Sequence, residues 1–172
     1  MTDHVFELAP SGRSKCRSCG LSIAKDDLRF GESMDNPFGE GNMVQWHHPA
    51  CAAHRRPEAL LEAIDVYDGQ DKDELQTTAE RISSNRRLQR IGKLEQASSG
   101  RARCRHCKEL IEKDDLRVPL VFFEEGTYSN SGFVHVTCLN DYCEGGEVWP
   151  TLAQFAIDAD EEMLELADSF VN

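Results

Sequence analysis

The feature that most constrains the fold is a duplicated cysteine motif. Residues 7–29 align with residues 95–117 at an offset of 88, and 14 of the 23 positions are identical. Each copy holds a Cys-x-x-Cys pair among arginines and lysines, and each continues into Lys-Asp-Asp-Leu-Arg. Identity at this level indicates a tandem duplication, so the two modules are expected to share one fold.

Six of the seven cysteines fall into two sets of three, and a histidine completes each set. Disulfides are the alternative, but they need an oxidising compartment, and the number of cysteines is odd. Three thiolates and one imidazole form a closed tetrahedral zinc site with no open position for a reacting water. The sequence therefore predicts two structural Zn2+ ions per chain. The predicted ligands are Cys16, Cys19, His48 and Cys51 in the first module and Cys104, Cys107, His135 and Cys138 in the second.

The remaining histidines and the seventh cysteine are expected outside these sites. His47 adjoins His48, but only His48 keeps the His-x-x-Cys spacing that is seen at His135. Cys143 has no matching cysteine in the first module and is expected to be a free thiol. The other histidines are expected on the surface, and they are His4, His54 and His106.

Local patterns in the first module predict strands followed by helices. Short strands are expected at residues 5–8, 28–30 and 44–48, because these runs are rich in apolar residues and bounded by turn residues. Gly, Pro and Asn predict a loop at residues 36–42. After Cys51, helical spacing of apolar residues predicts helices around residues 60–64 and 73–82.

The second module repeats this order. We expect a strand at residues 116–123, a loop at 126–132 and a strand at 133–135, followed by an acidic helix with a broad apolar face. The predicted class is α+β, with two small zinc-stabilised modules that each consist of a short antiparallel sheet and C-terminal helices. The predicted domains are a first finger at 1–85, a basic linker with helical spacing at 86–94, and a second finger at 95–172.

The net charge of −12 is concentrated at one end of the chain. Residues 141–172 hold nine acidic residues and no Lys or Arg, so they carry nine of the twelve net negative charges. This acidity lowers the tendency to bind nucleic acid non-specifically but does not exclude a local basic site. The acidic helix is either a packing element with a solvated face, or an autoinhibitory or partner-binding tail.

No apolar run approaches the roughly 20 residues that span a bilayer, and the N-terminus lacks the apolar core of a signal peptide. We therefore expect no membrane interaction. The expected location is the cytoplasm or nucleoid of a bacterium, or the nucleus of a eukaryote.

Three motif elements together suggest a family. They are Ser-Gly-Arg-x-x-Cys-x-x-Cys, Ile-x-Lys-x-x-Leu-Arg and Trp-x-His-x-x-Cys. This pattern resembles the zinc finger of poly(ADP-ribose) polymerases, which also occurs in a DNA ligase and in plant polynucleotide phosphatases. The resemblance covers roughly residues 4–85 and 93–172 and includes no catalytic domain.

The resemblance implies a non-enzymatic, free-standing pair of fingers that binds DNA strand breaks (nicks, gaps or ends) without regard to sequence. Such a protein would act as a sensor or adaptor in DNA repair. The implied partners are broken DNA and other repair proteins, with no small-molecule substrate.

The resemblance also implies two kinds of DNA contact. Arginines of the Gly-Arg and Leu-Arg elements, with neighbouring basic residues, would grip the DNA backbone, which positions a protein without reading bases. Apolar side chains on the loop before the Trp would cover bases unstacked at the break, at about 1–3 kcal/mol per stacked base. The backbone-contact candidates are Arg13, Lys15, Arg17, Arg29, Arg101, Arg103 and Arg117. The capping candidates are Phe38 and Met43 in the first module and Tyr128 in the second.

Structural alternatives exist for two of these residues, since Arg29 could pair with Asp26 or Asp27, and Phe38 could pack into the finger's own core. The second module also departs from the pattern, with Phe133 in place of the Trp and a single capping candidate. It is therefore expected to bind DNA more weakly or to contact the other finger.

The rival function is a zinc-stabilised protein–protein adaptor. An enzyme is disfavoured, because the zinc sites are closed and no nucleophile–base pair has a recognisable spacing.

Overall fold

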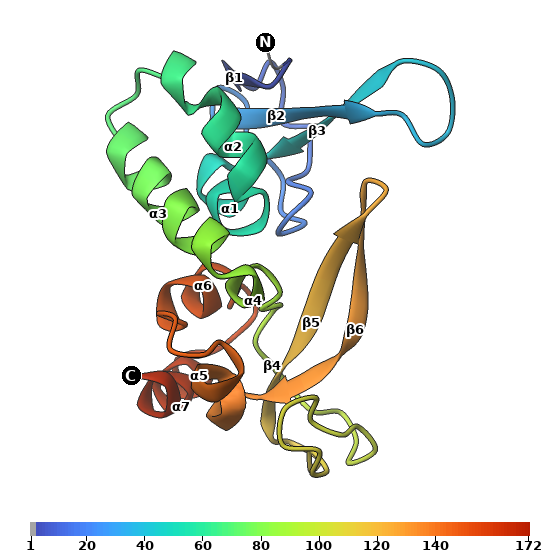
Figure 1. Ribbon diagram of the computed structural model, residues 1–172, viewed down its shortest axis with the longest axis vertical. Coiled ribbons are helices and arrows are strands. Elements are labelled where there is room, and N and C mark those ends of the chain that lie inside the picture. The colour runs from blue at the N-terminus through green and yellow to red at the C-terminus, as the bar shows by residue number, and fades with distance from the viewer. Residues whose placement is uncertain (1–2) are drawn as a thin grey trace. The chain divides into compact units, whose positions relative to one another are not determined.

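The computed structural model describes residues 3–172, whose contacts divide the chain into two compact units. The first unit ends at Ser84, and the second is Asn85–Asn172. Each unit contains a three-stranded antiparallel sheet followed by helices, and in the second unit the short helix α4 (Arg86–Gln89) precedes the sheet (Figure 1). The predicted α+β class, with the order of sheet and then helices in both modules, is confirmed.

The sheet of the first unit has the order β1-β2-β3. Its strands are β1 (Val5–Leu8), β2 (Leu28–Asp35) and β3 (Asn42–His47). Phe30 of β2 is fully buried and pairs with both Phe6 and His47. Its neighbour Gly31 points to the opposite face, where an added Cβ would lie 2.7 Å from the Trp46 ring. The sheet is therefore packed tightly on both sides at this point.

Helices cover the inner face of this sheet. They are α1 (Pro49–Arg55), α2 (Pro57–Ala63), the short 3-10 helix η1 (Ile64–Val66) and α3 (Lys72–Ser84). A proline at the first position starts both α1 and α2, where its fixed φ suits a helix and its missing N–H is not needed. Phe30, Ala52, Leu60 and Ala79 are all fully buried in one cluster, which joins the sheet to the helices.

The sheet of the second unit has the order β4-β5-β6. Its strands are β4 (Glu95–Gln96), β5 (Leu116–Glu124) and β6 (Thr127–His135). The prediction of a loop at residues 126–132 is wrong, because β6 already begins at Thr127. Glu125 and Gly126 have φ values of 50° and 76° and form the two-residue turn between the strands. Two positive φ values match the twist of a tight hairpin, so the polar residues that follow can continue the ladder on an exposed ribbon.

The helices of the second unit are short apart from the last. They are α4 (Arg86–Gln89), the 3-10 helix η2 (Val136–Cys138), α5 (Leu139–Tyr142), α6 (Trp149–Gln154) and α7 (Glu161–Val171). The acidic segment that the sequence indicated as one helix is thus two. Asp160 explains the restart, because its Oδ1 accepts a hydrogen bond from the Met163 N–H and caps α7.

The stretch 86–94 contains α4 and packs into the second unit. Leu88, Ile91 and Leu94 are each at most 1% exposed. The Gly92 N–H donates to the Pro119 carbonyl at 2.8 Å. Its proposed role as a linker between functional domains stays a prediction.

Among residues 3–172, no helix combines the length and the apolar character that a membrane crossing requires.

Candidate metal centres and DNA interface

The first Cys-x-x-Cys segment is a tight knuckle. The Cys16 N–H donates to the Leu21 carbonyl and the Gly20 N–H to the Cys16 carbonyl, both at 2.8 Å. Gly20 has a φ of 79°, a conformation that glycine adopts without strain. The knuckle places Cys16 and Cys19 beside His48 and Cys51, which come from the end of β3 and from α1. The ligand atoms of these four residues lie within 4.8 Å of one another.

The second knuckle repeats this geometry. The Cys104 N–H donates to the Glu109 carbonyl at 2.9 Å, and the Lys108 N–H donates to the Cys104 carbonyl at 3.0 Å. Lys108 stands where the first knuckle has Gly20 and keeps a positive φ of 69°. The ligand atoms of the second predicted set also lie within 4.8 Å of one another, and they belong to Cys104, Cys107, His135 and Cys138.

Both clusters have the dimensions of a zinc site. The Nδ1 atoms of His48 and His135 lie 3.4 Å and 3.5 Å from Cys19 Sγ and Cys107 Sγ, and each lies 3.9 Å from the third cysteine of its set. Zn–S bonds of about 2.3 Å and Zn–N bonds of about 2.0 Å in a tetrahedron put neighbouring ligand atoms about 3.6 Å apart. The donor sets therefore fit two structural Zn2+ ions per chain.

A hydrogen bond orients the histidine of the second site. His135 Nε2 lies 3.1 Å from the Leu110 carbonyl oxygen and donates to it in the tautomer that leaves Nδ1 unprotonated. Such contacts fix the ring and leave the other nitrogen for the metal.

The thiols of each cluster do not share protons equally. In the first cluster, a hydrogen bond from Cys51 lowers the pKa of Cys16 to about 2, whereas burial raises the pKa of Cys19. In the second cluster, burial disfavours the charged form of Cys104, but hydrogen bonds from backbone N–H groups outweigh it and lower the pKa of Cys104 to about 6, whereas burial and the Cys104 charge raise the pKa of Cys138 to about 12. Zinc binding deprotonates all its thiol ligands, so zinc affinity falls as the pH falls.

A buried polar group lies beside the first zinc site. Glu32 is 3% exposed, and its carboxylate accepts two hydrogen bonds from Arg56, from Nε at 2.8 Å and from Nη2 at 2.5 Å. His47 is fully buried, with Nε2 at 3.7 Å from Glu32 and Nδ1 at 2.8 Å from the Ser18 hydroxyl. His47 thus connects the knuckle to the sheet and, as predicted, lies outside the ligand cluster.

The Leu-Arg arginine is held in the same way in both units. Arg29 is 7% exposed, donates to Glu7 and to the Ser14 hydroxyl, and stacks at 3.5 Å on the Trp46 ring. The ion pair forms with Glu7, and the alternative of a pair with an aspartate of the Lys-Asp-Asp segment is wrong.

The second unit repeats this arrangement. Arg117 pairs with Glu95 at 2.9 Å and stacks at 3.7 Å on Phe133. Neither glutamate was predicted as the partner of its arginine, although their identity in the two repeats was a usable signal.

The other basic candidates lie at the surface. All are exposed and belong to the knuckles or to the turn before them, and they are Arg13, Lys15, Arg17, Arg101 and Arg103. Their contact with DNA stays a prediction, as does that of Arg29 and Arg117.

The three capping candidates differ in exposure. Phe38, in the loop between β2 and β3, is 88% exposed, so the alternative that it packs into the core is wrong. Its N–H donates to the Asn36 side chain at 3.0 Å, which shapes the loop. Met43 is half-buried and pairs with Met34 across the hairpin. Tyr128 is also half-buried, with its ring 4.9 Å from that of Phe123.

Two histidines that were expected on the surface are fully or partly buried. His54 on α1 is 6% exposed, and burial together with Arg81 and Arg55 lowers its pKa to about 4. His54 follows Cys51 by three residues and lies on the inner face of α1, which explains why it is buried and not on the surface as expected. His4 is half-buried and accepts a hydrogen bond from the Ser33 N–H. His106 is exposed, and Cys143 is a buried free thiol.

The fold and the two ligand sets define a class of protein, a tandem pair of Cys3His zinc fingers. The family comparison then specifies the type. Residues 7–85 match the family model described as the poly(ADP-ribose) polymerase and DNA-ligase Zn-finger region. The first finger is thus of the poly(ADP-ribose) polymerase type over these residues, and a second Cys3His site lies at residues 104–138.

Curated relatives agree with this assignment. Poly [ADP-ribose] polymerase 1 of Oryza sativa subsp. japonica is 30% identical over 139 residues, which cover 76% of this chain and 14% of the relative. The Gallus gallus enzyme of the same name is 31% identical over 65% of this chain and 13% of its own length. Polynucleotide 3'-phosphatase ZDP of Arabidopsis thaliana is 25% identical over 78% of this chain and 23% of its own length. The chain thus spans less than a quarter of each of these relatives.

Proposed function

We propose that the chain binds DNA at strand breaks (nicks, gaps or ends) without reading base sequence, and serves as a sensor or adaptor. The observation that carries this proposal is Phe38, an aromatic side chain that is 88% exposed at the tip of a hairpin. A large apolar side chain in water gains free energy when it covers another apolar surface. In intact duplex the base faces are covered, but a break leaves a terminal face on which a ring can stack.

The basic groups near the first knuckle support this proposal. Arg13, Lys15 and Arg17 are exposed on one segment, where they can neutralise phosphates on either side of a break. Arg29 is different, because its guanidinium is already bonded to Glu7 and stacked on Trp46. We infer that any phosphate contact by Arg29 is made by a side chain that is already held in place, which reduces the entropy lost on binding.

The proposal is for a binding protein and not for an enzyme. The zinc ions, held by four protein ligands each, stabilise the fingers and leave no position for a substrate. We also propose that the chain has repair proteins as partners. Its proposed location is where genomic DNA is found, the nucleoid or the nucleus.

The test is an affinity measurement on three DNAs of the same sequence: a circle with one nick, a linear blunt-ended duplex and an intact circle. The zinc-loaded chain and one fixed salt concentration are used throughout, because affinity for DNA depends steeply on salt. We expect tighter binding to the nicked and blunt-ended DNA than to the intact circle. Equal affinity for all three would overturn the proposal.

A protein–protein adaptor is the second candidate function. The observation that favours it is the acidic end of the second unit, where residues 141–172 hold no Lys or Arg. Absence of any DNA binding by a chain that retains two zinc ions would favour this candidate.

A further inference from the structure

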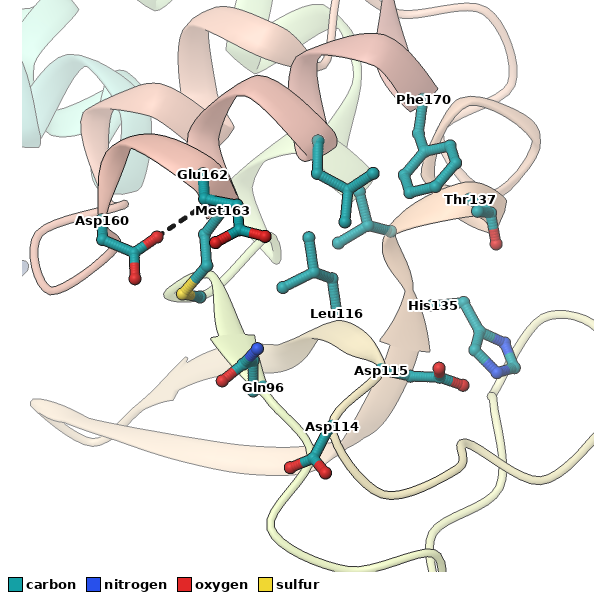
Figure 2. Close-up of a pocket in the computed structure, with 12 residues that line it drawn as sticks. Gln96, Asp114, Asp115, Leu116, His135, Thr137, Asp160, Glu162, Met163 and Phe170 are labelled. Atoms are coloured by element: carbon teal, nitrogen blue, oxygen red, sulfur yellow. Dashed lines mark hydrogen bonds between the residues drawn. The ribbon is translucent and has the colours of Figure 1, made fainter.

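A pocket opens in the second unit between the start of β5 and helix α7 (Figure 2). Its volume is about 310 Å3, and its apolar lining includes Leu116, Met163, Leu166 and Phe170. Leu166 and Phe170 are 46% and 42% exposed, which leaves two large apolar side chains of one helix in contact with water. Covering such side chains is favourable, so the pocket offers free energy to an apolar group that fills it.

Carboxylates stand on two sides of this apolar lining. Asp114 and Asp115 precede β5, whereas Asp160 and Glu162 belong to the start of α7, and Figure 2 shows the two pairs on opposite sides of the pocket. Two of the four are held by local hydrogen bonds, because Asp160 accepts from the Met163 N–H and Asp115 accepts from the Glu112 N–H.

The pocket lining has no Lys or Arg side chain that would offset the charge of these carboxylates. None of the twelve residues around the pocket is Lys or Arg, and residues 141–172, which include all of α7, have neither. The pocket therefore combines an apolar interior with a negative rim. Its volume is at the low end of the range for ligand pockets, about 300–1,000 Å3, which suits one or two large side chains.

We propose that this pocket binds a segment of another protein that carries one or two large apolar side chains flanked by Lys or Arg. The apolar side chains would cover Leu166 and Phe170, and the flanking cations would face the two carboxylate pairs. Nucleic acid does not fit this surface, because phosphates would be repelled by the rim. The proposal adds a protein-binding site to the second finger and does not depend on the DNA-binding proposal.

The test is a selection from a phage-displayed library of random 12-residue peptides, with the full zinc-loaded chain as bait. We expect the selected peptides to share a large apolar residue between Lys or Arg residues. Their binding, measured by fluorescence anisotropy, should weaken at least about tenfold in the Leu166→Glu variant, as for a central contact of an interface. Leu166 is exposed, so this variant is expected to fold, which the zinc content of two ions per chain would check.

A matched pair of double variants separates the pocket from overall charge. Asp114→Asn with Glu162→Gln removes two negative charges at the rim, and Glu161→Gln with Glu165→Gln removes two from the same unit outside the pocket lining. The rim variant should weaken peptide binding several-fold and reduce its salt dependence, whereas the other should have little effect.

Three outcomes of the peptide experiments would overturn the proposal: no shared pattern among the selected peptides, unchanged binding by the Leu166→Glu variant, or equal effects of the two double variants. The proposal would also be overturned if the chain forms a dimer that the Leu166→Glu substitution dissociates. The surface would then be assigned to a second copy of the chain.

Discussion

The two fingers share a fold but are built differently behind the sheet. In the first, the buried Glu32 and His47 form a polar group with the partly exposed Arg56 next to the zinc site. The repeat places Leu120, Val134 and Cys143 at the corresponding positions of the second finger, and these side chains are at most 4% exposed. One architecture thus tolerates either an ion pair with a histidine or three apolar side chains in the same place.

This difference bears on the stability of the first finger and on how its helices are attached to its sheet. A buried ion pair is often no more stabilising than apolar side chains of similar volume, but removal of one partner leaves a charge without compensation. Arg56 lies at the junction of α1 and α2, so its bond to Glu32 fixes that junction to the sheet. The same strand continues into the hairpin that carries Phe38, whereas the second finger ends its hairpin in a two-residue turn.

The largest expected effect follows from removal of a zinc ligand. Cys51→Ser should reduce the zinc content from two ions to one and unfold the first finger, because a small finger depends on metal binding for its stability. Cys138→Ser should do the same to the second finger. The chain has one tryptophan in each unit, Trp46 and Trp149, so the two indole NMR signals report the fingers separately. Loss of zinc without loss of the matching indole signal would contradict a structural role.

The buried polar group gives the next largest effect. Glu32→Leu should destabilise the first finger by roughly 1.5–3 kcal/mol, because it removes the charge-assisted hydrogen bonds that the buried carboxylate accepts from the partly exposed Arg56. Urea unfolding monitored through the Trp46 signal measures this change. The matched control carries Leu, Val and Cys at positions 32, 47 and 56, which copies the second finger and should restore most of the stability. A triple variant less stable than the single one would show that the two interiors are not interchangeable.

A smaller effect concerns the pH dependence of the first finger. His54 has a pKa of about 4 in the folded chain against 6.5 when exposed, so the unfolded chain takes up a proton first as the pH falls. The stability is therefore complete above about pH 6.5 and is lost as the pH falls toward 4. The His54→Gln variant should lose about 1 kcal/mol less than the unmodified chain between pH 7.5 and 5.5. Zinc loss in acid affects both chains alike, so their difference isolates His54, and parallel losses would contradict its burial as a neutral group.

The smallest effect is expected at the exposed arginines. Arg13→Ala should weaken binding to nicked DNA and lower the slope of log affinity against log salt by roughly 0.9, the value for one lost phosphate contact. Arg101→Ala should change both less, if the second finger binds DNA more weakly. Lys72→Ala, which removes a half-buried lysine at the start of α3, is the control for loss of a cation away from the knuckle. Equal slopes for the Arg13 variant and the unmodified chain would exclude a phosphate contact there.

The sequence predicted what depends on local spacing. The zinc ligands follow from the Cys-x-x-Cys and His-x-x-Cys pairs, and the common fold follows from the repeat. It predicted only the end of β6, at residues 133–135, because the polar residues around Asn130 look like a loop until the turn at Glu125 and Gly126 brings them beside β5.

Tertiary packing accounts for the other errors. Arg29 pairs with Glu7, which is 22 residues away, because β1 and β2 are adjacent strands that place the two residues opposite each other. His54 is buried because α1 packs against the rest of the helical layer. Spacing along the sequence reveals neither the Arg29–Glu7 pair nor the burial of His54, whereas it does reveal the zinc ligands.

The central claim is that the first finger recognises a break through Phe38 at the tip of its hairpin. The most direct test is the ratio of affinities for nicked and intact circular DNA, measured for the zinc-loaded chain and its Phe38→Ala, Tyr128→Ala and Val66→Ala variants at one salt concentration. Val66 is a control on another element, and it is also a strongly exposed apolar residue, at 78%. We predict that Phe38→Ala lowers the ratio by about 5- to 150-fold, the equivalent of 1–3 kcal/mol for a lost stacked base, with little change for intact DNA. A ratio that Phe38→Ala leaves unchanged, or that Val66→Ala lowers equally, would contradict the claim.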